Sequence, residues 1–302
     1  MGLKRRDFLK IAGVAASSMV MSEARANTEE CTDFGDVFGV LVDTTVCIGC
    51  RNCEAACNDK NKLAENKDFT DKSVLSHHRR PSLEAYTVVN TFPNAKGMNG
   101  QSFMKIQCMH CNDPACVSAC IVGALSKCAH GPVSYEADRC IGCRYCMVAC
   151  PYQVPAYEYD EAVAPRVMKC DFCNDRIHDD NPPACVAACP AEALTFGRRS
   201  DLIDLARLKI KKEPEKYTDH IFGEHEVGGS SWMYLASTEF KATELPQLPH
   251  DPVPPYTETI QHGIFKYFIP PVALYGFLGL VMHSLREDEN GNDVGGHDDT
   301  QR

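Results

Sequence analysis

The chain lacks the short motifs that mark several common enzyme classes. It has no G-x-G-x-x-G after a strand-like segment and no G-x-x-x-x-G-K-[ST], G-x-S-x-G or H-E-x-x-H. These absences argue against dinucleotide binding, P-loop, serine hydrolase and zinc protease chemistry. No C-x-x-C pair is followed by histidine, so c-type haem attachment is not expected. The formal net charge of -10 makes nucleic acid an unsuitable partner.

Cysteine, by contrast, is abundant and strictly spaced. The chain has 18 cysteines, and all but Cys31 and Cys128 fall into four runs. The first and third runs have the spacing C-x2-C-x2-C-x3-C, which is typical of 4Fe-4S binding in bacterial ferredoxins. The candidate ligands are Cys47, Cys50, Cys53, Cys57, Cys108, Cys111, Cys116, Cys120, Cys140, Cys143, Cys146, Cys150, Cys170, Cys173, Cys185 and Cys189. The pattern indicates four 4Fe-4S clusters and a role in electron transfer.

The runs also form an internal repeat. Cys-Ile-Gly-Cys-Arg-Asn-Cys at 47–53 returns as Cys-Ile-Gly-Cys-Arg-Tyr-Cys at 140–146, and the second and fourth runs both close with Pro-Ala-Cys-Val-x-Ala-Cys. Gly49 and Gly142 allow the tight loop that places neighbouring thiolates at the corners of one cluster. The sequence therefore predicts a duplicated two-cluster ferredoxin.

Structural zinc and disulfides are the alternatives for these cysteines. Zinc is normally held by two C-x2-C pairs per ion and has no use for a fourth ligand from another run. A disulfide framework is typical of small secreted domains, whereas about 220 residues precede the apolar C-terminal segment, enough for a sizeable core. Four matching runs favour clusters, and Cys31 and Cys128 are expected to be free or buried thiols.

The N-terminus predicts export. Lys4-Arg5-Arg6-Asp7-Phe8-Leu9-Lys10 has the form of a twin-arginine signal, and an apolar stretch with an Ala24-Arg25-Ala26 cleavage pattern follows it. We expect residues 1–26 to be a signal peptide, so that the domain of residues 27–244 lies in the periplasm. Twin-arginine export carries folded proteins, which suits clusters inserted beforehand.

The C-terminus predicts a single anchor in the inner (cytoplasmic) membrane. Residues 264–282 are apolar apart from Lys266 and approach the length of about 20 residues that a membrane helix needs. We expect a Pro-rich linker at 245–262, an extended spacer at least over 245–256, then a transmembrane helix at 263–283 and an acidic cytoplasmic tail at 284–302. A buried helix of a soluble domain is the alternative for the apolar segment.

The predicted fold class is α+β, loop-rich, with the duplicated ferredoxin-like domain followed by the one membrane helix. Short strands are expected at 37–42, 104–107, 133–136, 166–169 and 194–197, and short helices should begin around the fourth cysteine of each run. Residues 201–212 have the apolar spacing of an amphipathic helix packed on the cluster core.

Two histidine-containing segments need an interpretation. Residues 58–105 form a polar insertion whose His77-His78-Arg79-Arg80 we interpret as a solvated loop, with partner binding as the alternative. His110 stands between Cys108 and Cys111. Because the surrounding spacing fits 4Fe-4S, we expect His110 at the surface or beside a cluster, not as a ligand.

The chain resembles a known family over almost its whole length. Cys140-Ile-Gly-Cys-Arg-Tyr-Cys-Met-Val-Ala-Cys-Pro-Tyr-Gln-Val-Pro, Gln107-Cys-Met-His-Cys and Thr259-Ile-Gln-His are similar to the ferredoxin-like iron-sulfur subunit of membrane-bound nickel-iron hydrogenases of the hydrogenase-2 type. That family lies within the wider group of four-cluster electron-transfer subunits of molybdopterin oxidoreductases. The resemblance implies a non-catalytic partner of the hydrogenase small and large subunits. It would receive electrons from the small subunit and pass them to a quinone-reactive, multi-helix membrane subunit.

The resemblance also implies how the cysteines are shared, because each cluster in the family takes its last ligand from a paired run. The implied sets are Cys47, Cys50, Cys53 with Cys189; Cys170, Cys173, Cys185 with Cys57; Cys108, Cys111, Cys116 with Cys150; and Cys140, Cys143, Cys146 with Cys120. Two other functions remain open: the same subunit of a periplasmic formate dehydrogenase or other molybdopterin oxidoreductase, and a structural or redox-sensing membrane protein.

Overall fold

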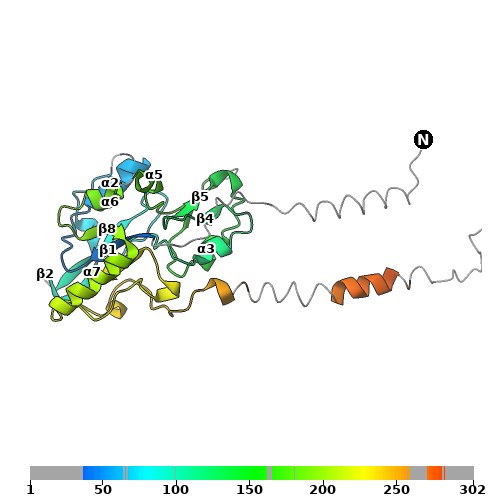
Figure 1. Cartoon of the computed structure of the whole chain (residues 1–302). Helices are drawn as coiled ribbons and strands as arrows, with labels where there is room; N and C mark the ends of the chain where they lie inside the picture. Colours follow the sequence, from blue (N-terminus) through cyan, green and yellow to red (C-terminus); the bar gives the residue numbers. More distant parts are fainter. Residues whose placement is uncertain are drawn as a thin grey trace, which may run out of the picture. The chain divides into compact units, whose positions relative to one another are not determined.

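The fold is built on a small sheet whose two faces are both covered. The computed structural model describes residues 37–63, 65, 67–98, 100–161, 165–179, 181–256, 258, 271–280 and 282. Strand β1 (Phe38–Asp43) is central and lies beside the antiparallel strand β8 (Leu194–Arg198) (Figure 1). Strand β9 (Trp232–Leu235) pairs with β1 in parallel on its other side. Residues from both ends of the domain therefore meet in one sheet.

The two faces of this sheet have different neighbours. Helix α7 (Arg199–Lys212) covers one face, where its Leu202 and Ala206 pack with Leu41, Met233 and Leu235. The opposite face carries the alternate residues of the same strands, which join the larger core that contains many of the cysteines. The helix predicted at 201–212 is confirmed, but it packs on the sheet, which separates it from the cluster core where we had expected it.

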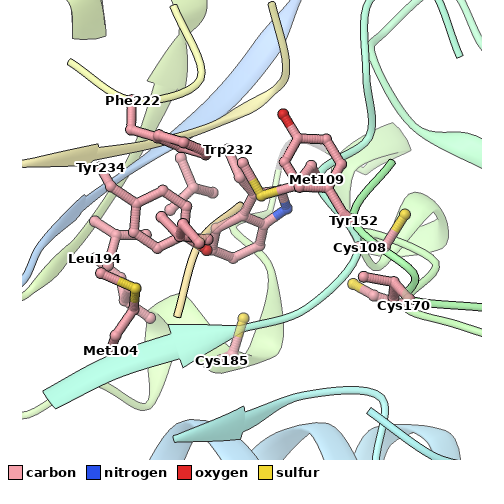
Figure 2. Close-up of a cluster of buried hydrophobic side chains, with 14 of the residues drawn as sticks. Met104, Cys108, Met109, Tyr152, Cys170, Cys185, Leu194, Phe222, Trp232 and Tyr234 are labelled. Carbon is pink, nitrogen blue, oxygen red and sulfur yellow. The ribbon is translucent and has the colours of Figure 1, made fainter. Parts of the chain in front are cut away.

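The larger core is rich in aromatic side chains. Trp232 and Tyr234 from β9 lie against Phe222 and Tyr152, and the thiols of Cys108, Cys170 and Cys185 border this group (Figure 2). The four residues of β9 are all buried because the sheet has no solvent-facing side. The aromatic core thus supports the cysteine loops from within.

The insertion at 58–105 is more ordered than a polar loop. It contains the 3₁₀ turn η1 (Ser73–Ser76) and most of a long hairpin, in which β2 (Val88–Met98) pairs with β3 (Gln101–Ile106). Two further two-stranded sheets pair β4 (Leu125–Lys127) with β5 (Val133–Tyr135) and β6 (Ala156–Tyr157) with β7 (Val167–Met168). All five predicted strand segments overlap observed strands.

The cysteine runs carry short helices: α2 (Asn52–Asn61), α3 (Ala115–Ser118), α4 (Tyr145–Ala149), α5 (Asn174–His178) and α6 (Ala184–Ala187). The prediction that helices begin around the fourth cysteine is wrong. Helices α2 and α4 begin directly after Arg51 and Arg144, whose positive φ values of 66° and 64° end the preceding loops. Except in α2, which passes through Cys57, the helix of each run has ended by its fourth cysteine.

The chain divides into two compact units, residues 1–253 and 254–302. Leu245, Leu248 and Val253 pack against the main core, after the turns η3 (Glu226–Gly228) and η4 (Phe240–Ala242). The globular unit therefore extends beyond the predicted boundary at 244, and the first part of the expected spacer belongs to it.

The predicted membrane helix at 263–283 is described only at residues 271–280 and 282, which are helical. Among the described residues, no helix is both long enough and apolar enough to cross a membrane. The predicted signal peptide at 1–26, Cys31 and the acidic tail at 284–302 lie outside the described residues. These assignments stay predictions.

Candidate metal centres

Each cysteine run contains a residue in the left-handed conformation two positions after its first cysteine. These residues are Gly49, Gly142, His110 and Phe172, with φ between 50° and 69°. The conformation turns backbone N–H groups toward sulfur: Gly142 N donates to Cys140 Sγ at 3.5 Å and Phe172 N donates to Cys170 Sγ at 3.3 Å. Such bonds stabilise a thiolate and help to set the potential of a cluster.

The first group of cysteines joins the first run to the last. Cys47, Cys50, Cys53 and Cys189, here called group A, line one small, mainly apolar cavity together with Lys105. The pKa of the Cys47 thiol is raised to about 11, mainly by burial, and the charges of Cys189 and Cys50 contribute to the rise. Four thiols around an apolar cavity suit a 4Fe-4S cluster.

The second group joins the fourth run to Cys57 of the first. In group B (Cys57, Cys170, Cys173 and Cys185), burial is the main cause that raises the pKa of Cys57 to about 12, and the charges of Cys185 and Cys173 add to it. Burial and Cys185 likewise help to raise the pKa of Cys173 to about 11. Helices α2 and α6, which carry Cys57 and Cys185, pack against each other.

Groups C and D repeat this exchange between the second and third runs. In group C (Cys108, Cys111, Cys116 and Cys150), burial raises the pKa of Cys111 well above its usual range, and the other three thiols raise it further. In group D (Cys120, Cys140, Cys143 and Cys146), burial and the other three thiols raise the pKa of Cys146 to about 11. Helix α3 packs against α4 between them.

The four groups follow one another in a line. Cys185 of group B acts electrostatically on Cys53 of group A, and Cys108 of group C acts on Cys170 of group B. Cys146 of group D acts on Cys116 of group C. The resulting order is A, B, C, D, and it differs from the order of the runs along the chain.

Group D has the most open end of this line. Cys143 is the one exposed thiol of the sixteen. The exposed apolar residues Ile121, Ile141, Tyr145 and Val148 come from the same two cysteine runs. In group D, Ala124 N donates to Cys120 Sγ at 3.2 Å.

One observation tests whether the residues present suit 4Fe-4S clusters. The Tyr152 hydroxyl is buried without a hydrogen-bond partner, within electrostatic range of Cys111 and Cys150. It is therefore available to donate to a sulfide of a group C cluster, and the donor sets fit 4Fe-4S.

The segment His77 to Arg80 is an exposed loop apart from Arg79, as expected, but its two arginines are held by the body of the protein. Arg79 binds Glu54, which is buried in α2 between Cys53 and Cys57, and Arg80 donates to the carbonyl oxygen of Tyr152. Burial alone would raise the pKa of Glu54, but the hydrogen bonds from Arg79 and Arg51 outweigh it and lower the pKa. These residues fix the insertion onto the cysteine loops.

Several residues lie closer to the cysteines than the sequence indicates. His110 is fully buried, stacks on Phe172, and accepts a hydrogen bond from Val133 N at Nδ1, so of its two expected positions the surface is wrong and the place beside the cysteine groups is the one observed. Lys105, Lys127 and Lys169 are buried among the cysteines. Cys128 is a partly buried free thiol outside the four groups.

Comparison with known proteins places these centres in a family. A model of the 4Fe-4S dicluster domain matches residues 99–199. The hydrogenase-2 operon protein HybA of Escherichia coli O157:H7 is 32% identical over 98% of this chain and 99% of that protein. The iron-sulfur subunit of the nitrate-inducible formate dehydrogenase of Escherichia coli K12 is 31% identical over 81% of this chain and 83% of that subunit.

The chain belongs to the family of 4Fe-4S proteins that includes HybA and this formate dehydrogenase subunit. A protein of Nitratidesulfovibrio vulgaris is 47% identical over 80% of this chain, and the match covers 66% of that protein's length. Family membership confirms the ferredoxin-like α+β fold and the 4Fe-4S chemistry predicted from the cysteine spacing. The family contains both hydrogenase and formate dehydrogenase proteins, so membership alone does not choose between them.

Proposed function

We propose that the chain is the electron-transfer subunit that relays electrons from a periplasmic nickel-iron hydrogenase heterodimer to a quinone-reactive integral membrane subunit. One observation carries the proposal: sixteen thiols form four groups in a line, and each group takes its fourth thiol from a different run. A line of redox centres suits electron transfer through a protein, whereas a redox sensor needs only one centre.

Each group would hold one 4Fe-4S cluster through its four thiolates. Cluster binding must displace the protons that burial keeps on thiols such as Cys47, Cys57 and Cys111. When bound, the clusters would supply one-electron transfer in which no bond is made or broken, and the thiols of each group would hold one cluster next to that of the following group. The protein's part is to hold the clusters in order and to set their potentials through sulfur hydrogen bonds, charge and exposure.

The location completes the proposal. The twin-arginine signal at 1–26 would export the loaded domain, and the helix at 263–283 would anchor it with the tail at 284–302 on the cytoplasmic side. Replacing Arg5 and Arg6 together with Lys should retain a folded, cluster-loaded precursor in the cytoplasm. Periplasmic protease access to the cluster domain of that variant would contradict the export assignment.

The hydrogenase assignment rests on the match to HybA over nearly both full lengths. A formate dehydrogenase assignment is the second candidate, because the iron-sulfur subunit of that enzyme is almost equally similar over most of the chain. Both candidates use the same four groups and differ in the protein that supplies electrons.

Membranes from cells that lack this chain distinguish the two candidates. For a hydrogenase subunit, hydrogen oxidation by a soluble dye should survive, because the dye takes electrons directly from the catalytic heterodimer. Hydrogen-dependent quinone reduction should fall to background and return when the chain, or a Cys128→Ser control, is supplied. Loss of formate-dependent quinone reduction alone supports the second candidate, and unchanged electron flow from both substrates supports a structural or sensing role.

A further inference from the structure

Three lysine side chains lie inside the cysteine core. Lys105 on β3, Lys127 on β4 and Lys169 after β7 are 2%, 8% and 6% exposed. Lys105 Nζ donates to Gln107 Oε1 at 2.9 Å and lies 4.3 Å from the centre of the Trp232 ring. Each of the three therefore has its ammonium group in the protein interior.

Uncharged groups provide the hydrogen bonds of the other two. Lys127 Nζ donates to the carbonyl oxygens of His110 and Gly131, and Lys169 Nζ donates to those of Val133 and Cys170. Among the ion pairs of the described residues, none includes Lys105, Lys127 or Lys169. Burying an ammonium group without a counter-charge is unfavourable, so an anion is expected nearby.

The neighbours of these lysines are the cysteine groups. Lys105 forms part of the wall of the group A cavity and lies within electrostatic range of Cys53 of group A and Cys170 and Cys185 of group B. It stands between the first two groups of the line.

Lys127 and Lys169 flank the third group. Lys127 lies within electrostatic range of Cys108, Cys111 and Cys116, and Lys169 acts on Cys116 while bonding the carbonyl of Cys170. In group D, the main influences on the pKa of Cys146 are its burial and the charges of Cys120, Cys140 and Cys143, and none of them comes from a lysine.

A 4Fe-4S cluster with four thiolates is an anion, and one added electron makes it more negative. A fixed positive charge in a low-dielectric interior stabilises the reduced form more than the oxidised form. We propose that Lys105, Lys127 and Lys169 are the buried counter-charges of the clusters in groups A, B and C and hold the reduction potentials of these clusters up. This inference rests on the proposed cluster content of the four groups.

The test is redox titration of the purified, cluster-loaded protein followed by electron paramagnetic resonance. Lys105→Met keeps the length and apolar stem of the side chain and removes its charge. At a fixed potential, the reduced-to-oxidised ratio of at least one of the clusters A and B should fall tenfold, about 59 mV for one electron. The group D signal, identified by its loss in Cys143→Ser, should not move.

Matched variants make the result specific. Lys241→Met removes an exposed lysine and should leave all four potentials unchanged. Lys127→Met should shift the group C cluster, and it carries the test if Lys105→Met does not fold. Unchanged potentials in a fully loaded Lys105→Met or Lys127→Met protein, or an equal shift of all four clusters, overturns the proposal. Absence of iron from the unmodified protein would instead refute the proposed clusters.

Discussion

His110 and Phe172 stack on each other in the protein interior, with ring centroids 5.0 Å apart and planes inclined by 24°. Both residues have positive φ, 50° and 60°, at the position where the other two cysteine runs have glycine. The two looser runs thus place side chains at the turn of the cysteine loop, and these side chains meet between groups B and C. The stack fixes one loop against the other.

The energetic balance at Phe172 can be measured. Phe172→Ala should destabilise the protein by about 3 to 5 kcal/mol, because the loss of a buried ring leaves a cavity. Phe172→Gly leaves a similar cavity but relieves the left-handed backbone, which costs a non-glycine residue about 1 to 2 kcal/mol. The glycine variant should therefore unfold at the higher temperature of the two in circular dichroism. The reverse order would show that the backbone is not strained there.

Substitutions at Gly49 and Gly123 allow the cost of backbone conformation to be measured apart from the cost of steric crowding. Both have positive φ, but a Cβ at Gly49 would lie 2.5 Å from the Phe103 ring, whereas a Cβ at Gly123 has no atom within 4 Å. Gly123→Ala should cost about 1 to 2 kcal/mol from the backbone alone. Gly49→Ala should cost more and reduce the iron content, because the group A loop must shift. Equal effects in thermal unfolding and iron analysis would contradict this account.

Iron content tests the exchanged fourth ligand. The unmodified protein should contain about sixteen iron atoms and as many acid-labile sulfides, four per cluster. Cys150→Ser should perturb or remove the group C cluster, because serine is a harder and weaker ligand for iron than cysteine. The iron count should then fall toward about twelve. Cys128→Ser, outside the four groups, is the matched control and should retain full loading. A full count in Cys150→Ser, with unaltered spectra, would argue against its assignment to group C.

Acid sensitivity should depend on Asp43, which is buried at the end of β1. Burial alone would raise the pKa of Asp43, but hydrogen bonds from Thr45, Lys209 and Tyr217 outweigh it and lower the pKa. Because the pKa is lower in the folded state, the carboxylate stabilises the fold above the unfolded value of about 3.9. This contribution should be constant near neutral pH and decline only as the pH falls below about 5 toward the folded pKa.

Tyr217→Phe provides the matching measurement, since the Tyr217 hydroxyl donates to Asp43 Oδ2 at 2.8 Å. The variant should lose about 1.5 to 3 kcal/mol at pH 7, and the difference from the unmodified protein should shrink as the pH falls. Thermal unfolding at several pH values measures both effects. Tyr159→Phe, a change at an exposed tyrosine, is the control. A difference that is independent of pH would place the effect of Tyr217 in packing.

The spacing of the cysteines was enough to predict the chemistry and the duplication, because cluster ligands impose fixed intervals on the chain. The four sets implied by the family resemblance are the sets that the structure brings together, while their occupation by iron stays a prediction. The strands were predictable for a simpler reason. Segments such as 37–42 and 194–197 are short and apolar, as expected of strands whose side chains are buried on both faces of a sheet.

The sequence was a poor guide where tertiary contacts override local preference. Lysine is usually exposed, so nothing near Lys105 in the sequence marks it as buried against Trp232. The helix starts were misplaced because Arg51 and Arg144 adopt a conformation that favours glycine. Arg79 looked like part of a basic surface loop, yet its partner Glu54 is 25 residues earlier in the chain.

The nesting of the four groups also sets the order in which the ligand sets become complete during synthesis. Groups C and D use only cysteines from 108 to 150, whereas groups A and B need both the 47–57 and the 170–189 runs. A ribosome therefore completes the inner two ligand sets first, while Cys47, Cys50 and Cys53 still lack Cys189. The two outer ligand sets become complete only after the fourth run has been synthesised. In a nascent protein interrupted between 150 and 170, the sets of groups C and D would be complete, while the cysteines of the first run would still lack their partners in the fourth.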